Sequence, residues 1–159
     1  GSLRPSSSRH ASTVGIAHRR ARLAPGAARG HDGAMLRVRV ESFLRAYARA
    51  FGALDAPAIA RFYAPPCAFV NPLSRSMIRD EAALVAYFAR LTRVHRRTRW
   101  AGATAQLVAL TPHGGHLADA RVRWHVVDQG GAALWDFEHG YLLEVGEERP
   151  VRIVTAIGH

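Results

Sequence analysis

Hydrophobic positions follow a helical period between residues 40 and 97 and a strand period after residue 100. From Val40 to Phe51, large apolar side chains recur at i, i+3, i+4, i+7 and i+11, which predicts an amphipathic helix. Asp80 is expected to cap a further helix that runs to about Arg97. Its expected buried stripe consists of Leu84, Tyr87, Phe88, Leu91 and Val94.

A short helix and a short strand are predicted between these two helices. Asp55 offers an N-cap oxygen to a helix that begins at Ala56-Pro57. Pro65-Pro66 should end this helix, because a proline ring excludes helical geometry from the preceding residue. Residues 67–70 are expected to form a strand that Asn71-Pro72 closes, and residues 73–79 a connection.

Four long strands are predicted in the last third of the chain, over residues 100–110, 116–127, 132–145 and 151–158. Gly114-Gly115 and Gly130-Gly131 supply turn residues between them. Alternation predicts an apolar inner face made of Ala118, Ala120, Val122, Trp124, Val126, Trp135, Phe137, His139, Tyr141, Leu143, Val145, Val151, Ile153, Thr155 and Ile157. Three helices followed by an antiparallel meander indicate the α+β class, with helices on one face of a curved sheet.

Composition separates an N-terminal segment from one folded domain. Residues 1–34 are rich in Arg, Ala and Ser and hold few large apolar side chains, so we expect them to be disordered or upstream sequence. Residues 35–159 then form a single domain. The net charge is +10, and every Lys or Arg position is an arginine. This pattern suggests a GC-rich coding sequence rather than selection for nucleic-acid binding, so a nucleic-acid partner is not expected.

Cys67 is the only cysteine, so an intrachain disulfide is impossible and a reducing, cytoplasmic location is the simplest expectation. In an apolar strand it is expected to be a small buried hydrophobe. No apolar run is long enough to cross a membrane, so no membrane partner is expected. No spacing of ligating residues matches a known metal site, and neither metal nor other cofactor is expected.

The order of two helices, Tyr63-Ala, strand and Asn71-Pro72 resembles the opening of the NTF2-like superfamily, which includes SnoaL-like and ketosteroid-isomerase-like proteins. The resemblance extends over residues 36–158. The segment Val122-Arg-Trp-His-Val-Val-Asp-Gln-Gly, followed by Tyr141-Leu-Leu-Glu, is most similar to an uncharacterised branch. It implies a cone in which a bent antiparallel sheet wraps around three helices and a pocket opens between them. It also implies a homodimer formed through the sheet.

The resemblance to ketosteroid isomerases aligns Tyr47 with their oxyanion-hole tyrosine and Asn71 with their catalytic base, which is an aspartate. An amide cannot accept a proton at neutral pH. The position of their second oxyanion donor, a protonated acid, falls near Gly140 or Tyr141, and no aspartate stands there. Classical ketosteroid isomerase activity is therefore not expected.

A pocket hypothesis remains. Tyr47, Asn71, His139 and Tyr141 are the candidate catalytic residues, with His139 as general base or as donor to a carbonyl oxygen. The candidate substrate-binding residues are Phe51, Tyr63, Phe69, Trp124, Trp135 and Phe137. Each has a structural alternative: the tyrosines, His139 and the large rings as core residues, and Asn71-Pro72 as a turn.

Two functions are compatible with these patterns. The first is binding of a small apolar carbonyl compound, with acid–base chemistry of an isomerase, cyclase, dehydratase or hydrolase that needs no cofactor. The second is a non-catalytic module that uses the same fold for dimerisation or protein interaction. An open pocket favours the first, and a pocket filled by side chains favours the second.

Overall fold

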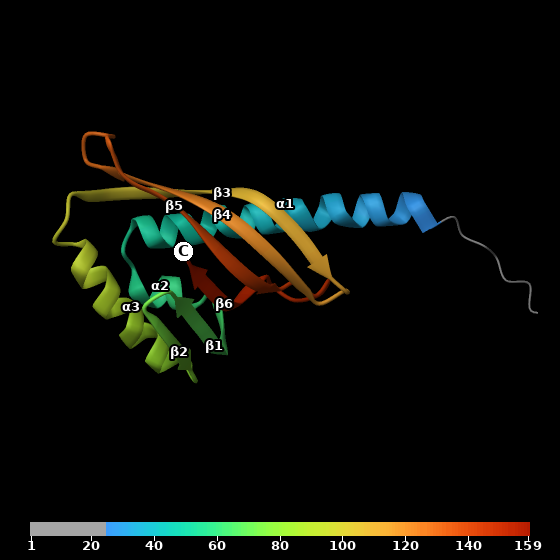
Figure 1. Cartoon of the computed structure of the whole chain (residues 1–159), viewed down its shortest axis with the longest axis horizontal. Coiled ribbons are helices and arrows are strands. Elements are labelled where there is room, and N and C mark those ends of the chain that lie inside the picture. Colours follow the sequence, from blue (N-terminus) through green and yellow to red (C-terminus); the bar gives the residue numbers. More distant parts are fainter. Residues whose placement is uncertain (1–24) are drawn as a thin grey trace, which may run out of the picture.

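The computed structural model describes residues 25–159, with side chains from residue 32 onward. Within that part of the chain, three helices pack on a curved six-stranded sheet (Figure 1). The elements are α1 (Pro25–Gly52), α2 (Ala56–Ala60), β1 (Tyr63–Asn71), β2 (Ser74–Ile78), α3 (Glu81–His95), β3 (Trp100–His113), β4 (Leu117–Asp128), β5 (Ala133–Glu144) and β6 (Arg152–Gly158). The predicted α+β cone is confirmed.

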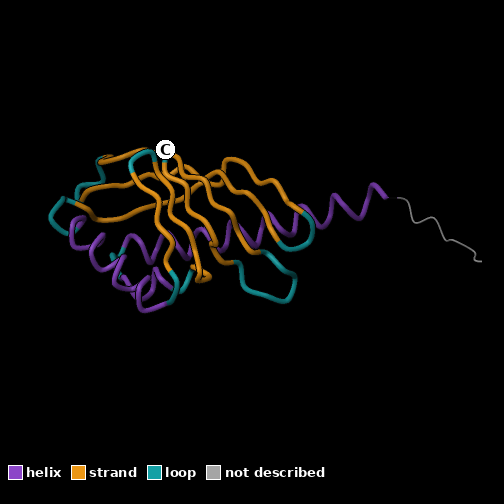
Figure 2. Tube along the Cα trace, turned by 60° about the horizontal axis from the view of Figure 1, so that its bottom comes forward, coloured by secondary structure: helices purple, strands orange, loops and turns teal. Residues whose placement is uncertain are grey.

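The sheet order is β2-β1-β6-β5-β4-β3. All neighbouring pairs are antiparallel except β1 and β6, which run parallel. The helices lie on one side of the sheet (Figure 2), and α1 runs along β3 (Figure 1). The inner face of the sheet and the apolar stripes of the helices therefore bury one core.

Helix α1 begins earlier than the expected domain boundary at Met35. Residues 25–34 are helical, whereas the sequence predicted disorder or upstream sequence there, and residues 1–24 lie outside the described residues. Pro25 suits the first helical position, but residues 25–34 hold three glycines beside three alanines, so helix propensity alone does not explain the extension. The predicted stripe is confirmed, since Val40, Leu44 and Tyr47 are buried. Arg39 ties α1 to the turn before β6 by donating to three carbonyl oxygens there.

The two predicted N-caps are confirmed. The Asp55 carboxylate accepts from the Ala58 N–H at 3.1 Å, and the Asp80 carboxylate accepts from the Ala83 N–H at 2.8 Å. The predicted stripe of α3 is wrong at one position, because Val94 is 60% exposed. Thr92, which follows Leu84 and Phe88 at intervals of four residues, is buried in its place.

The segment around Pro65-Pro66 differs from the prediction. Helix α2 ends at Ala60, and both prolines lie inside β1. The pairing of β1 with β6 is irregular between Tyr63 and Ala68, where the prolines supply no N–H to the ladder. The residues expected as a connection instead form β2, which pairs with β1 as a hairpin. Cys67 is buried in β1, as predicted.

The predicted inner face is confirmed along β4 and β5 but fails at the end of β6. Ile153 faces inward opposite Leu143, and a register shift follows between Leu142 and Leu143. Beyond this bulge, Ala156 is the buried residue opposite Tyr141, and Ile157 is 38% exposed. One extra residue in a strand reverses which side chains face inward, so alternation counted from Val151 placed Thr155 and Ile157 on the wrong face.

Candidate functional site

A cavity of about 300 Å³ lies between the inner face of the sheet and helices α1 and α3. Thirteen of its fifteen lining side chains carry an aromatic or imidazole ring. The surface of the cavity is therefore mostly apolar, with a few hydroxyl, indole and imidazole groups as its polar points. The lining residues are Tyr47, Phe51, Tyr63, Phe69, Tyr87, Phe88, Leu91, His95, Trp100, Trp124, Trp135, Phe137, His139, Tyr141 and Ala156. Among these described residues none carries a carboxylate or a guanidinium group.

The long axis of the site follows β5. Alternate residues of this strand, Trp135, Phe137, His139 and Tyr141, all line the cavity. Burial increases along the series, from 41% exposure at Trp135 to 4% at Tyr141. The cavity is therefore closed at its Tyr141 end, which we call the inner end, and reaches solvent at its Trp135 end, which we call the outer end.

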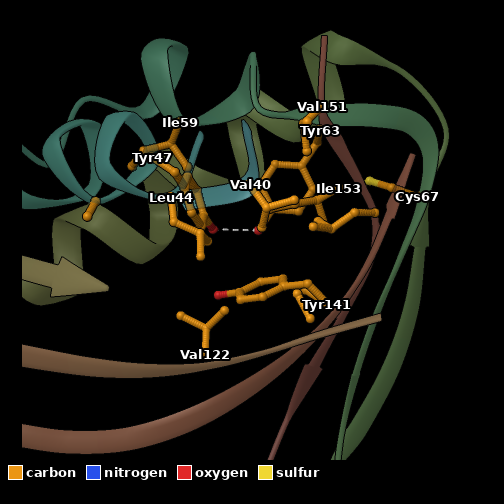
Figure 3. Close-up of a cluster of buried hydrophobic side chains, with 14 of the residues drawn as sticks. Val40, Leu44, Tyr47, Ile59, Tyr63, Cys67, Val122, Tyr141, Val151 and Ile153 are labelled. Atoms are coloured by element: carbon orange, nitrogen blue, oxygen red, sulfur yellow. Dashed lines mark hydrogen bonds between the residues drawn. The ribbon is translucent and has the colours of Figure 1, made fainter. Parts of the chain in front are cut away.

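Three tyrosine hydroxyls meet at the inner end. The hydroxyls of Tyr47 on α1 and Tyr63 on β1 form a hydrogen bond of 2.7 Å. The Trp124 indole N–H donates to the Tyr141 hydroxyl oxygen at 3.0 Å. Figure 3 shows Tyr141 on the sheet, opposite the bonded pair of Tyr47 and Tyr63. The rings of Tyr47 and Tyr141 stand edge to face, with centroids 6.1 Å apart.

These hydroxyls act as hydrogen-bond donors and not as bases. Burial raises the pKa of Tyr47, Tyr63 and Tyr141 well above the usual value of 10.0, so all three stay protonated at neutral pH. An indole N–H can only donate, so the Tyr141 oxygen accepts from Trp124 and its own proton points elsewhere. The inner end therefore presents neutral O–H donors in an apolar surrounding.

His139 is the titratable group nearest to these hydroxyls along β5. Its ring lies between those of Phe137 and Tyr141, at centroid distances of 5.2 Å and 5.8 Å. Burial, assisted by the charge of His159, lowers the pKa of His139 below its usual value. Its Nδ1 atom is buried and has no hydrogen-bond partner within the described residues. The side chain is thus a neutral imidazole that can accept or donate one proton.

A second imidazole lies at the outer end. The ring of His95, on the last turn of α3, is 4.7 Å from Trp100 and 5.8 Å from Trp135. Burial lowers the pKa of His95 as well, and its Nδ1 atom also lacks a partner in the described part of the chain. Sequence reasoning missed His95 because it stands in an arginine cluster. The signal was present, since Leu84, Phe88, Leu91 and His95 follow the apolar stripe of α3.

Nine of the ten predicted site residues line this cavity, and Asn71 does not. Tyr47, His139, Tyr141, Phe51, Tyr63, Phe69, Trp124, Trp135 and Phe137 are all found there. The Asn71 side chain is exposed at the β1–β2 turn, where it donates to the Ser74 hydroxyl and accepts from the N–H groups of Leu73 and Ser74. The structure places the Asn71 amide in a turn outside the cavity, which is the structural alternative left open by the sequence.

The described residues hold no group of three or more His, Cys, Asp or Glu side chains arranged for a metal ion. No helix in the described part of the chain is long and apolar enough to cross a membrane. The Cys67 thiol is buried, and burial raises its pKa to about 11, so it is not a ready nucleophile. The polar groups that line the cavity are tyrosine hydroxyls, indole N–H groups and imidazoles.

Helices packed on a strongly curved sheet, with an aromatic cavity between them, define an NTF2-like protein with a cystatin-like α+β fold. The chain belongs to the family of NTF2-like proteins designated DUF6841, whose model matches residues 37–159. No curated protein matches the chain significantly.

Solved structures share this fold at low sequence identity. A domain of unknown function with a cystatin-like fold from Nostoc punctiforme has a TM-score of 0.62 at 13% identity, over 77% of this chain and 75% of its own. A ketosteroid isomerase-like protein from Erwinia carotovora atroseptica has a TM-score of 0.57 at 13% identity, over 76% and 92%. An NTF2-like superfamily protein from Salmonella enterica serovar Typhimurium has a TM-score of 0.56 at 15% identity, over 80% and 92%.

Proposed function

We propose that the cavity binds a small, neutral, largely apolar molecule that carries a carbonyl group. The observation that carries this proposal is the inner end, where tyrosine hydroxyls meet inside a cavity of about 300 Å³ lined by rings. This volume is at the lower limit of small-molecule sites, roughly 300–1,000 Å³. The lining offers no charged partner among the described residues, so an ionised ligand would lose its hydration without compensation.

Counting protons at the inner end indicates what the ligand must supply. Tyr47 and Tyr63 share one hydrogen bond, which uses one of their two hydroxyl protons. Tyr141 accepts from Trp124, and the neighbouring Tyr47 hydroxyl takes up the proton of Tyr141. One hydroxyl proton of the three tyrosines then remains for a further acceptor. The cluster therefore has more donors than the pairs themselves use. A carbonyl oxygen is an acceptor without a proton, so it fits this excess better than a hydroxyl or an amine does.

The same geometry supports acid–base chemistry on the bound ketone. The neutral imidazole of His139 can take a proton from the carbon next to the carbonyl, while a tyrosine O–H holds the oxygen that becomes negative. The electron pair of the broken C–H bond moves to the oxygen, and the imidazolium returns the proton to carbon or to oxygen. Such a step requires no redox partner.

The proposal is tested with 2-tetralone, a neutral bicyclic ketone. Saturable quenching of tryptophan fluorescence measures binding, because Trp124, Trp135 and Trp100 line the cavity. Loss of one net hydrogen bond in Tyr141→Phe should weaken binding about five- to tenfold. Tyr87→Phe is the matched control, since Tyr87 lines the same cavity but takes part in neither inner-end hydrogen bond. Absence of saturable binding by the unmodified chain contradicts the proposal.

Proton NMR in deuterated water tests the chemical step separately. Exchange of the protons next to the carbonyl of 2-tetralone should exceed that given by free imidazole at the same concentration. His139→Gln should reduce this exchange by about 10²-fold or more, the usual contribution of a general base, while binding persists. Binding without exchange in the unmodified chain would restrict the function to ligand recognition.

A homodimer or protein-interaction module is the second candidate, and the outer face of the sheet supports it. Arg123 on β4 pairs with Glu138 on β5 at 2.7 Å, and Arg121 lies 3.7 Å from the same carboxylate. His125 pairs with Asp136 on the same two strands. A face that carries both charges in rows can pair with a second copy of itself. Sedimentation equilibrium of the unmodified chain and of Arg123→Glu tests this candidate, since a sheet dimer should dissociate in the variant.

A further inference from the structure

The outer end of the cavity holds a polar group that the proposed chemistry does not use. His95 reaches the cavity from α3, and its ring packs against Trp100 and Trp135. The Trp100 indole N–H already donates to the Gly52 carbonyl oxygen at 3.1 Å. Nδ1 of His95 has no partner among the described residues. The His95 imidazole is thus the buried group at this end with unused hydrogen-bonding capacity, beside the indole N–H of the more exposed Trp135.

Two of the arginines near His95 make contacts with other groups. Arg96 donates to the Leu54 carbonyl oxygen at 2.9 Å, and Arg99 pairs with the buried carboxylate of Asp128 at 2.6 Å. Neither contact involves the imidazole. A buried polar nitrogen without a partner costs about 1–3 kcal/mol. A ligand that brings a hydroxyl or a similar group to the outer end removes this cost.

The two polar ends of the cavity are well separated. The backbones at Trp135, which contacts His95, and at Tyr141 are roughly 20 Å apart along β5, at about 3.3 Å per residue. The side chains span less, because the rings of His95, Trp100, Phe51 and Tyr47 follow one another at centroid distances of 4.7, 6.1 and 5.7 Å. Trp135 and His139 are roughly 13 Å apart by the same measure. Between the two ends along β5, Phe137 offers apolar surface and His139 is the polar group. A ligand that satisfies both ends must be elongated and must carry polar groups at its two extremities.

The geometry points to His95 as a specificity-determining residue that contacts a second hydrogen-bonding group, at the far end of an elongated ring compound whose carbonyl lies against the inner tyrosines. This inference rests on the proposed function, because it assigns the second end of the same cavity. It defines the ligand class as neutral hydroxy-ketones built on a flat, extended ring framework.

Two matched probes separate this inference from the proposed function. The first is 4-acetylbiphenyl, which carries a carbonyl at one end only, and the second is 4-acetyl-4′-hydroxybiphenyl, which adds a hydroxyl at the other end. Calorimetric titration of the unmodified chain should give about five- to tenfold tighter binding of the hydroxylated probe, the gain of one net hydrogen bond. In His95→Phe this gain should disappear, while the affinity for 4-acetylbiphenyl stays within about twofold of the original value.

His116→Phe is the control substitution, because His116 is exposed in the β3–β4 turn and does not line the cavity. It should leave the gain from the hydroxyl unchanged. NMR of the imidazole nitrogens in the unmodified chain gives a second readout that does not depend on the folding of a variant. The His95 nitrogen resonances should shift with the hydroxylated probe and stay in place with 4-acetylbiphenyl.

Equal affinity for the two probes, or a gain that survives in His95→Phe, overturns the role of His95 and leaves the cavity proposal intact. Failure of both probes to bind to a chain that binds 2-tetralone overturns the role of His95 alone, and failure of all three ligands overturns both proposals. Identical shifts of the His95 resonances with both probes also contradict a contact with the hydroxyl.

Discussion

Filling the cavity from Ala156 should stabilise the protein and abolish ligand binding. Ala156 lies on β6, is 6% exposed, and stands between Tyr141 and Phe69 in the register of the sheet. Its methyl group lines the cavity, so a longer side chain has space ahead of it. Ala118 on β4 provides the matched control. It is fully buried in the same core but does not line the cavity.

The two substitutions to leucine should have opposite signs. Ala156→Leu adds three carbon atoms, which at about 0.8 kcal/mol per buried CH₂ gives at most about 2.4 kcal/mol. Fixing the leucine rotamer costs about 0.5–1 kcal/mol. We therefore expect Ala156→Leu to raise the free energy of unfolding by about 1–2 kcal/mol. Ala118→Leu should lower it by about 1–3 kcal/mol, because added carbons in a packed core force strain.

Urea denaturation followed by circular dichroism measures both effects. A change in the midpoint with a constant slope identifies a change in stability. The same variants are then titrated with 2-tetralone, and Ala156→Leu should show no saturable binding. If Ala156→Leu destabilises the protein as much as Ala118→Leu does, side chains fill the cavity in solution, and the reasoning that leads to a ligand site is refuted.

Three further predictions follow from the hydrogen bonds and the burial of the site. Tyr47→Phe and Tyr63→Phe should each lower the free energy of unfolding by about 1–3 kcal/mol, because each leaves a buried hydroxyl without its partner. In a double-mutant cycle measured with urea, the double variant should lose about 1 kcal/mol less than the sum of the two single losses. Additive losses would contradict a hydrogen bond between the two hydroxyls. Burial lowers the pKa of His95 and His139 below 6.5, so on acidification the unfolded chain binds protons before the folded chain does. The contribution of these two histidines to the free energy of unfolding is therefore fully present above pH 6.5. It falls as the pH drops through 6.5 towards the pKa values of the folded chain. Urea midpoints measured as a function of pH should show this decline, and the double variant His95→Gln/His139→Gln should show a smaller one; an equal decline in both proteins would assign it to other groups. Asn71→Ala should lower the free energy of unfolding by about 0.5–1.5 kcal/mol, because it removes the hydrogen bonds of the turn. The affinity for 2-tetralone should stay unchanged. Weaker binding would show that Asn71 contributes to the ligand site.

The period of the apolar residues predicted those elements that bury one face regularly along their whole length. The stripe of α1 and the inner face of β5 are correct because burial selects apolar side chains at a fixed interval, and regular geometry keeps that interval from end to end. The aromatic lining of the cavity follows from the same two patterns. Tyr47, Trp124 and Tyr141 could therefore be placed together before their contacts were known.

Prediction failed where a local irregularity interrupts the interval. The bulge in β6 adds one residue, and no residue type near Val154 announces it, so Ala156 and Ile157 exchanged faces. Pro65-Pro66 were correctly interpreted as incompatible with a helix, but their tolerance at an irregular point of a strand was not foreseen. The β1–β2 hairpin was missed for a related reason, since Ser74–Met77 are all exposed and show no apolar alternation.

His95 shows why a site is harder to predict than a fold. Its sequence neighbours are arginines, and charge suggests a solvated helix end. Its position on the stripe of α3 instead turns the ring toward Trp100 and Trp135. The charge of its neighbours predicted exposure of His95, whereas its position on the apolar stripe predicted burial. The long-range contact between α3, β3 and β5 determines which of the two holds. Sequence patterns contain no direct record of such a contact.

The cavity contains buried polar groups that a core selected for stability alone would not need. Phenylalanine at both Tyr141 and Trp124 would remove a hydroxyl and the indole N–H that donates to it, at two positions that are 4% and 3% exposed. Leucine at His95 and at His139 would each remove one buried nitrogen that lacks a partner in the described structure. A core that serves only to hold a dimer surface has no reason to bear these costs, because apolar side chains of similar size stabilise it more. Polar groups gathered on one cavity, uncharged and left with unused hydrogen-bonding capacity, are instead what a site for a neutral, hydrogen-bonding ligand requires.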